Sequence, residues 1–333
     1  MFSKHNHFFV IALILLSIFI AKSKNRVPYV VLGNFMFDYK LLVAFNAVIE
    51  EAGFEKAAKA LGLTQSAVSQ RVKLLEARLG HAVLVRETPP IPTEIGKLLL
   101  SHVQKVSLLE WDIQNFVPTL NDEQSFKRLR IALNADSLAT WWASSVSDFC
   151  NENNLLLNLI AEDQEVSLNF MRTGEVTACI GSVKNPIDGA RSILLGAMRY
   201  KAVATPQFIA KYFPNGITPD AIADAPALIF GPEDILQHRF LESLGVKKRF
   251  KYHFCPSSEG FVRFTEANLG WAMIPELQIQ QHLKNGNLVE LIPNTEIDVP
   301  LYWHYWLNSG ELVNRLTRHL MRSSKQQLIR LHR

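Results

Sequence analysis

The sequence DYKLLVAFNAVIEEAGFEKAAKALGLTQSAVSQRVKLLEARLG (Asp38–Gly80) predicts three short helices in succession. Its apolar residues recur every three or four positions, the spacing that places them on one face of a helix. Asp38 and Thr64 can each cap the helix that follows, because their side-chain oxygens accept hydrogen bonds from backbone N–H groups. Gly53 and Gly62 end the helices before them. The expected helices cover residues 38–52, 54–61 and 65–79.

The third of these helices has an apolar face and a polar face. The apolar side chains are Val68, Val72, Leu75 and Leu79. The side chains predicted to contact DNA lie at its start and on the opposite face, and are Thr64, Gln65, Ser66, Ser69, Gln70 and Lys73. Amide and hydroxyl groups can bond base edges, and an α-helix fits the major groove. This pattern indicates a helix-turn-helix; three amphipathic helices in another all-α core are the alternative that periodicity leaves open.

A wing is predicted directly after this segment. A short β-like run (Ala82–Val85) precedes Arg86, and three prolines within residues 89–92 then exclude a helix. Arg86 is expected to contact a phosphate or the minor groove, where a cation adds affinity with little sequence information. A surface ion pair with Glu87 or Glu76 is the alternative.

A longer amphipathic helix is predicted between Thr93 and Pro118. Thr93 can cap it, Glu94 lies in its first turn, and Pro118 stops it. Its apolar residues alternate at four and three positions, as along a coiled-coil seam, with His102 in the one polar position. The seam residues are Ile95, Leu99, Val106, Leu109 and Ile113. Pairing of two such helices would give a two-fold dimer and two DNA half-sites; a long helix packed within its own chain is the alternative.

From Leu129 onward, short apolar runs alternate with helical patterns, which is typical of an α/β fold. The polar stretch NDEQSFK (Asn121–Lys127), which precedes this region, is expected to act as a hinge. The predicted strands are residues 128–134, 155–163, 176–181, 200–208, 226–231, 271–275 and 301–307. The predicted helices are residues 136–150, 166–172, 233–244, 258–268 and 312–328.

Several of these segments resemble one protein family. The motifs GFEKAAKALGLTQSAVSQRVKLLEARLG (Gly53–Gly80) and VLVRETPPIPTEIG (Val83–Gly96) are similar to the DNA-binding end of LysR-type transcriptional regulators. Three later motifs resemble the branch of that family that responds to arginine and lysine, which has also been described as inhibiting chromosome replication initiation. They are LNADSLATW (Leu133–Trp141), KYFPNGIT (Lys211–Thr218) and LYWH (Leu301–His304).

The resemblance implies an α plus α/β protein with three parts. These parts are a winged helix-turn-helix (residues 36–92), a linker and dimerisation helix (93–120), and an effector-binding domain (127–333) like a two-lobed type-2 periplasmic binding protein. Lobe 1 would comprise residues 127–198 and 297–333, and lobe 2 residues 199–296. The stretch Ser182–Ser192 departs from the family pattern, which leaves the choice between arginine and lysine open.

An effector site is predicted where the first strand of lobe 1 ends. The turn after Asn134 into a helix places backbone N–H groups and the Ser137 hydroxyl at the cleft, where they suit a carboxylate. Asp136 can bind a cationic group, and the acidic residues after the second strand offer a second such partner. The expected effector-binding residues are Asn134, Asp136, Ser137, Glu162, Asp163 and Ser258. Ordinary helix capping is the alternative for Asp136, Ser137 and Ser258.

The composition indicates a globular protein without a disulfide framework. The chain has 333 residues, 48% hydrophobic and 20% charged, and a net charge of +4, which permits a polyanionic partner without requiring one. Cys150, Cys179 and Cys255 are odd in number and far apart, which suits a reducing cytoplasm. We find no motif of a nucleophile elbow, metal site or phosphate loop, and we expect neither catalytic residues nor a metal or cofactor. His304, between aromatic residues of a strand, is expected to be a core residue.

The first residues contain an apolar run, FFVIALILLSIFIA (Phe8–Ala21), with basic residues on both sides. It is shorter than the ~20 residues that span a bilayer and resembles the core of a signal peptide. Basic residues after the run disfavour translocation of the downstream chain. We expect residues 1–35 to lie outside the fold, upstream of a true start at Met36; a membrane anchor and a cleaved signal are the alternatives.

Together these features predict a DNA-binding transcriptional regulator and not an enzyme. The expected partners are double-stranded DNA, lysine or arginine as effector, and further copies of the chain in a homodimer or homotetramer, with RNA polymerase as a candidate partner. The expected location is the cytoplasm, with membrane anchoring left open by the apolar run. An extracytoplasmic amino-acid-binding protein would account for that run and for two lobes, but would leave Asp38–Phe116 without a role.

Overall fold

The computed structural model describes residues 37–117, 127–162 and 167–331. Within these ranges the chain forms two compact units, one up to Arg78 and one from Leu79 onward. The apolar leader, Met36, Asp163 and all but the last residue of the expected hinge lie outside the described residues.

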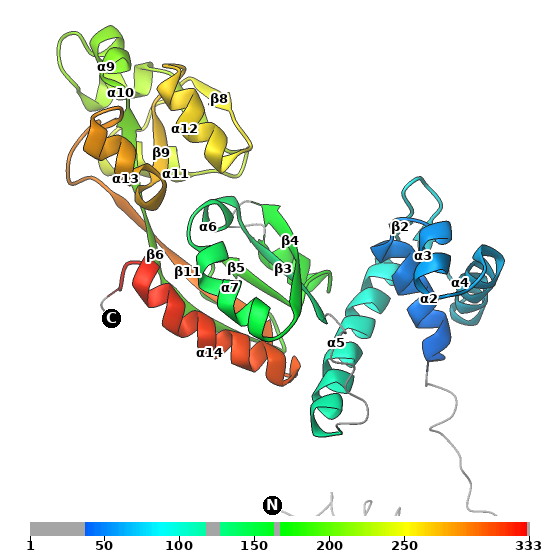
Figure 1. Ribbon diagram of the computed structural model, residues 1–333. Coiled ribbons are helices and arrows are strands. Elements are labelled where there is room, and N and C mark those ends of the chain that lie inside the picture. The colour runs from blue at the N-terminus through cyan, green and yellow to red at the C-terminus, as the bar shows by residue number, and fades with distance from the viewer. Residues whose placement is uncertain (1–36, 118–126, 163–166, 332–333) are drawn as a thin grey trace, which may run out of the picture. The chain divides into compact units, whose positions relative to one another are not determined.

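The first unit contains three helices (Figure 1), and the prediction of these helices is confirmed. They are α2 (Tyr39–Glu50), α3 (Phe54–Ala60) and α4 (Gln65–Leu79). The Asp38 carboxylate accepts a hydrogen bond from Lys40 N at 3.0 Å, and the Thr64 hydroxyl accepts one from Ala67 N at 3.2 Å. Gly62 follows α3 at a φ of 62°, a left-handed conformation that glycine adopts easily.

The second unit begins with a two-stranded wing and a long helix, both as predicted. These elements are β1 (Leu84–Val85), β2 (Ile91–Pro92), which pairs with β1 in antiparallel orientation, and α5 (Glu94–Phe116). Thr93 links the wing to the helix, because its hydroxyl accepts a hydrogen bond from Gly96 N at 3.1 Å and donates one to Ala82 O at 2.8 Å. The start of α5 is therefore fixed to the wing.

One seven-stranded sheet runs through the rest of this unit. Its strands are β3 (Lys127–Asn134), β4 (Leu155–Glu162), β5 (Ala178–Gly181), β6 (Ala190–Ala204), β9 (Ala272–Pro275), β10 (Val289–Glu290) and β11 (Ile297–Trp306). They lie in the order β10-β6-β11-β5-β3-β4, and β9 also pairs with β6. β3 is parallel to both β4 and β5, whereas β6 and β11 are antiparallel along their whole paired length.

The long strands β6 and β11 connect two lobes (Figure 1). Lobe 1 combines β3, β4 and β5 with α6 (Ala135–Ala139), α7 (Trp142–Glu152), α8 (Ser167–Arg172) and α14 (Gly310–Gln327). Lobe 2 combines β7 (Ala227–Ile229), β8 (Tyr252–Phe254), β9 and β10 with α9 (Pro206–Tyr212), α10 (Pro219–Asp224), α11 (Leu236–Ser243), α12 (Ser258–Glu266) and α13 (Glu276–Asn285).

Each lobe has a buried tryptophan in its core whose indole N–H is hydrogen-bonded. In lobe 1, Trp303 lies 6.2 Å from the Trp142 ring and donates a hydrogen bond to the Thr317 hydroxyl at 2.9 Å. In lobe 2, Trp271 lies 5.6 Å from the Phe240 ring and donates to Ile222 O at 3.1 Å. Large aromatic side chains supply much apolar area, and their polar ends usually find a partner when buried.

Two predicted elements of this region are wrong. The predicted helix 136–150 is two helices, α6 and α7, because the chain turns at Thr140, whose hydroxyl donates a hydrogen bond to Asp136 O, and then buries Trp141. The predicted strand 200–208 instead begins at Ala190 and ends at Ala204, where Thr205 caps α9 and Pro206 occupies its first turn. The helices α9, α10 and α13 and the strands β8 and β10 were not predicted.

Candidate functional site

α4 presents a polar face to solvent. The exposed residues of this polar face are Gln65, Ser66, Gln70 and Lys73, and Ser69 is half-buried. Its buried residues are Val68, Val72 and Leu75, which lie on the other side. The Thr64 hydroxyl caps the helix and lies 3.1 Å from the Ser66 hydroxyl. The arrangement leaves amide, hydroxyl and ammonium groups accessible along one side of a helix, as recognition of base edges requires.

Cationic side chains lie on α4 and after β1. Lys73 is exposed on the polar face of α4, and Arg86 is exposed after β1. Arg78, at the end of α4, pairs with Asp38 at 3.5 Å. Exposed cations of this kind position a protein on the phosphate backbone.

The linker helix α5 has two apolar faces. Of the predicted seam, Leu109 and Ile113 are exposed, Ile95 and Val106 are half-buried, and Leu99 is buried. Leu108 and Trp111 instead join the core of lobe 1. One side of α5 therefore packs within the chain, and another side exposes an apolar stripe that contains Leu109 and Ile113.

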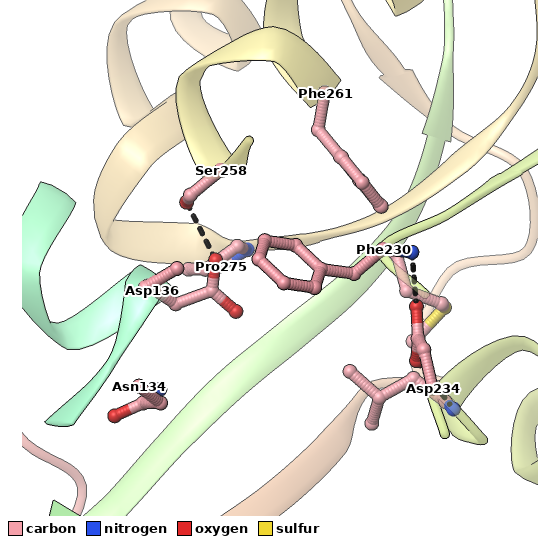
Figure 2. Close-up of a pocket in the computed structure, with 10 residues that line it drawn as sticks. Asn134, Asp136, Phe230, Asp234, Ser258, Phe261 and Pro275 are labelled. Carbon is pink, nitrogen blue, oxygen red and sulfur yellow. Dashed lines mark hydrogen bonds between the residues drawn. The ribbon is translucent and has the colours of Figure 1, made fainter. Parts of the chain in front are cut away.

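A pocket lies between the two lobes (Figure 2). Lobe 1 contributes Asn134, Ala135 and Asp136, and lobe 2 contributes Phe230, Asp234, Leu236, Ser258, Phe261, Met273 and Pro275. The pocket has about 450 Å³ of free space, including its opening to solvent. Its lining combines carboxylates and an amide with apolar walls.

Asp136 connects the lobes at this pocket. Its Oδ1 accepts a hydrogen bond from the Ser258 hydroxyl at 2.5 Å, and its Oδ2 accepts one from the Tyr200 hydroxyl on β6 at 2.6 Å. Gln278 holds the start of α12 by donating to Ser258 O at 3.1 Å. A carboxylate between two hydroxyl donors is well placed to bind a ligand cation.

Asn134 places a buried amide at the pocket. Its side chain is 2% exposed, and neither amide atom has a hydrogen-bond partner among the described residues. Buried polar groups are nearly always hydrogen-bonded, so such an amide in a pocket points to a ligand or to ordered water. An amide can donate to a carboxylate or accept from an ammonium group.

Asp234 and Phe230 are pocket residues that the sequence did not reveal. The buried Asp234 carboxylate accepts hydrogen bonds from Phe230 N at 2.9 Å and Leu236 N at 3.0 Å, which fixes the loop between β7 and α11. The loop places the Phe230 ring in the pocket, where Phe261 approaches from α12 (Figure 2). The sequence signal that could have indicated Asp234 is an acidic residue in a Gly-Pro turn directly after a buried strand.

The other predicted effector residues are placed differently. Ser137 is fully buried and accepts a hydrogen bond from the Trp141 indole at 3.0 Å, so its hydroxyl belongs to the core of lobe 1 and not to the pocket lining. Glu162 ends β4, and Asp163 lies outside the described residues.

His304 is a core residue, as expected. It is fully buried, its Nε2–H donates to Val183 O at 2.8 Å, and burial lowers its pKa. In the part of the chain that the structure describes, no cluster of His, Cys, Asp or Glu could hold a metal ion, and no helix is long and apolar enough to cross a membrane.

Two family descriptions match the chain. "Bacterial regulatory helix-turn-helix protein, lysR family" matches residues 39–97, and "LysR substrate binding domain" matches residues 122–328. The HTH-type transcriptional regulator ArgP of Pseudomonas fluorescens (strain Pf-5) is 61% identical over 294 residues, which cover 88% of this chain and 98% of that protein. ArgP of Pseudomonas aeruginosa (strain UCBPP-PA14) is 60% identical over 296 residues, covering 89% and 99%.

Solved structures agree with these matches. The crystal structure of ArgP from Mycobacterium tuberculosis superposes with a TM-score of 0.72 at 34% identity, covering 89% of this chain and all of that one. Full-length LysG from Corynebacterium glutamicum with bound effector Arg gives 0.62 at 32% identity, covering 88% and 100%. One family therefore accounts for all of these features, namely the three-helix unit with its exposed polar helix, the wing, the long helix and the two-lobed domain. This chain belongs to the LysR family of DNA-binding transcriptional regulators.

Proposed function

We propose that this regulator binds arginine or lysine between its lobes and that the bound amino acid changes how it binds operator DNA. The observation that carries the proposal is that one interlobe pocket holds both the Asp136 carboxylate and the buried Asn134 amide, which has no hydrogen-bond partner among the described residues. The arginine-bound LysG, at 32% identity, supports this choice of effector.

The pocket offers a place for each part of a basic amino acid. A ligand cation would take the place of the Ser258 hydroxyl at the Asp136 carboxylate. The aliphatic stem would lie between the Phe230 and Phe261 rings. The Asn134 amide is a better candidate for the ligand carboxylate than the start of α6, because α6 has five residues and so a weak dipole.

Titration calorimetry with arginine and with lysine tests the effector. Asp136→Asn keeps the shape of the side chain but removes its charge, so we expect at least a tenfold loss of affinity. Asp148→Asn, on the exposed side of α7, is the matched control and should bind like the wild type. Undiminished binding by Asp136→Asn would remove Asp136 from the site, and no binding by the wild type would refute the effector class.

On DNA, the contacts are proposed for Arg86 and for the polar set of α4, namely Thr64, Gln65, Ser66, Ser69, Gln70 and Lys73. Two copies would pair through the exposed stripe of α5 and place two α4 helices on a two-fold operator. The assembly would be a homodimer or homotetramer in the cytoplasm, with RNA polymerase as a further partner. Mapping the bound DNA in cells, with and without added arginine and lysine, tests this part.

The proposed domains are residues 36–92 for DNA binding, 93–120 for the linker helix and 127–333 for effector binding. Residues 1–35 are proposed to lie outside the functional chain. Sequencing the mature N-terminus tests the start at Met36. Cell fractionation that places the protein outside the cytoplasm would favour an extracytoplasmic role instead.

A further inference from the structure

Four residues of α5 contact lobe 1 along one side of the helix. They are Lys97, Ser101, Lys105 and Asp112, which we call the linker latch. Spacings of four, four and seven residues place all four side chains on one face of a helix. At 100° per residue, the exposed residues Leu98, Leu109 and Ile113 lie about 55°, 75° and 115° around the axis from the centre of this face. One helix can therefore hold lobe 1 and a second copy at the same time.

Asp112 supplies the cap that α14 lacks. Both of its carboxylate oxygens accept a hydrogen bond from Glu311 N, at 3.0 Å each, in the first turn of α14. Ser309 precedes that helix but makes no cap, because its hydroxyl donates to Trp306 O. A carboxylate at a helix start satisfies a free N–H group and interacts favourably with the helix dipole. Figure 1 shows the start of α14 beside α5.

The other three latch residues contact the segment that follows α8 and the end of β11. Gly174, at a φ of 74°, faces Ser101 so closely that a Cβ there would lie 2.5 Å from the Ser101 Cβ. Lys105 lies over the Trp306 ring, 4.2 Å from its centre, a distance typical of a cation–π contact. Lys97 lies 3.6 Å from the Glu175 carboxylate.

α14, which Asp112 caps, also supports the strand behind the pocket. α14 packs on β6, where the Ser324 hydroxyl donates to Leu195 O at 3.2 Å. β6 also carries Tyr200, which binds Asp136. Asp136 of the pocket and Asp112 of the latch are therefore both attached to the sheet and helices of lobe 1.

We propose that the linker latch fixes α5 to lobe 1 of its own chain, so that helix and lobe move as one body and the effector response reaches the DNA-binding end through this contact. The effector part rests on the proposed function. The latch itself is independent of it, because its contacts do not involve the pocket.

Hydrogen exchange tests the latch without any ligand. In the double variant Lys105→Ala/Asp112→Ala, the amides at the start of α14 should exchange at least tenfold faster than in the wild type. The control is Ser107→Ala/Glu110→Ala, two exposed positions on the same helix, which should leave these amides unchanged. Unchanged exchange in the latch variant would overturn the proposal. Asp112→Ala alone, which removes the acceptor for Glu311 N, replaces the double variant if the latter does not fold.

Operator binding with and without arginine tests the coupling, using the DNA fragment that the wild-type protein selects. The latch variant should bind arginine within twofold of the wild type, while the change in operator affinity that arginine causes falls at least threefold. A latch variant with faster exchange but a full arginine effect on DNA would overturn the coupling. A wild type that binds neither arginine nor lysine would refute the proposed effector, and hydrogen exchange would still decide on the latch.

Discussion

At the scale of single residues, His304 gives the protein a predictable pH dependence. The imidazole is fully buried, donates from Nε2 to Val183 O, and has a pKa lowered by burial. The unfolded chain, with an ordinary pKa near 6.5, therefore binds a proton at a higher pH than the folded chain does. The stabilising effect of the neutral side chain is complete above about pH 6.5 and is lost as the pH falls toward the lowered pKa of the folded state.

Urea unfolding at a series of pH values from about 7.5 to 5 measures this effect. We expect the free energy of unfolding to fall toward acid pH in the wild type and to fall less steeply in His304→Gln. His81→Gln, at an exposed position, is the control and should keep the wild-type slope. An equal slope in His304→Gln would assign the acid sensitivity to other groups.

Gln70 and Lys73 are predicted to serve DNA binding in different ways. Gln70→Ala should remove a base contact and relax sequence preference at one operator position, at about 1–3 kcal/mol. Lys73→Ala should instead weaken binding to all sequences about equally and lower the salt dependence, as the loss of a phosphate contact does. Selection of bound sequences from a random library, repeated at two salt concentrations, separates these outcomes.

The control for this pair is Gln280→Ala, an exposed glutamine on α13 of lobe 2. It should leave both affinity and sequence preference unchanged. If Gln70→Ala and Lys73→Ala both behave like this control, the polar face of α4 does not enter the groove.

At the scale of elements, α5 is expected to pair through its exposed stripe. Leu109 and Ile113 are 48% and 58% exposed, an unusual position for two large apolar side chains on one helix face. Leu109→Glu/Ile113→Glu would place like charges at the centre of a paired seam, and we expect it to convert the oligomer to monomers. Ser107→Glu, exposed on another side of α5, should leave the oligomer intact; sedimentation velocity measures both.

Elements set by local chemistry could be predicted from the sequence, and others could not. Thr64 and Thr93 cap α4 and α5 as their side chains suggest. The break between α6 and α7 was missed because Trp141 continues an apolar pattern while the chain turns beside it. β8 was missed because all three of its residues are exposed, so it lacks the alternation of a half-buried strand.

At the scale of the whole molecule, the proposed DNA-contacting face of α4 could be predicted from the sequence, whereas most of the interlobe pocket could not. The proposed DNA-contacting residues of α4 fall within one short stretch whose periodicity is visible in the sequence. The pocket is assembled from separate segments, and only Asn134, Asp136 and Ser258 had a local signal at a strand end or helix start. Phe230, Asp234 and Tyr200 are brought to it by the crossing strands and loops of the lobes. The hydrogen bond from Glu311 N to Asp112 could not be predicted from the sequence either, because the two residues are 199 positions apart.

Because the pocket draws on both lobes, a bound effector should stabilise the second unit as a whole. A ligand that binds only the folded state at 100 times its Kd adds about 2.7 kcal/mol. For a unit of this size that corresponds to roughly 5–11 °C in Tm. Scanning calorimetry with arginine should show this shift in the wild type and also in Leu109→Glu/Ile113→Glu, because the pocket lies within one chain. Asp136→Asn should lose the shift; a shift that disappears only in the monomeric variant would instead place the effector between two copies.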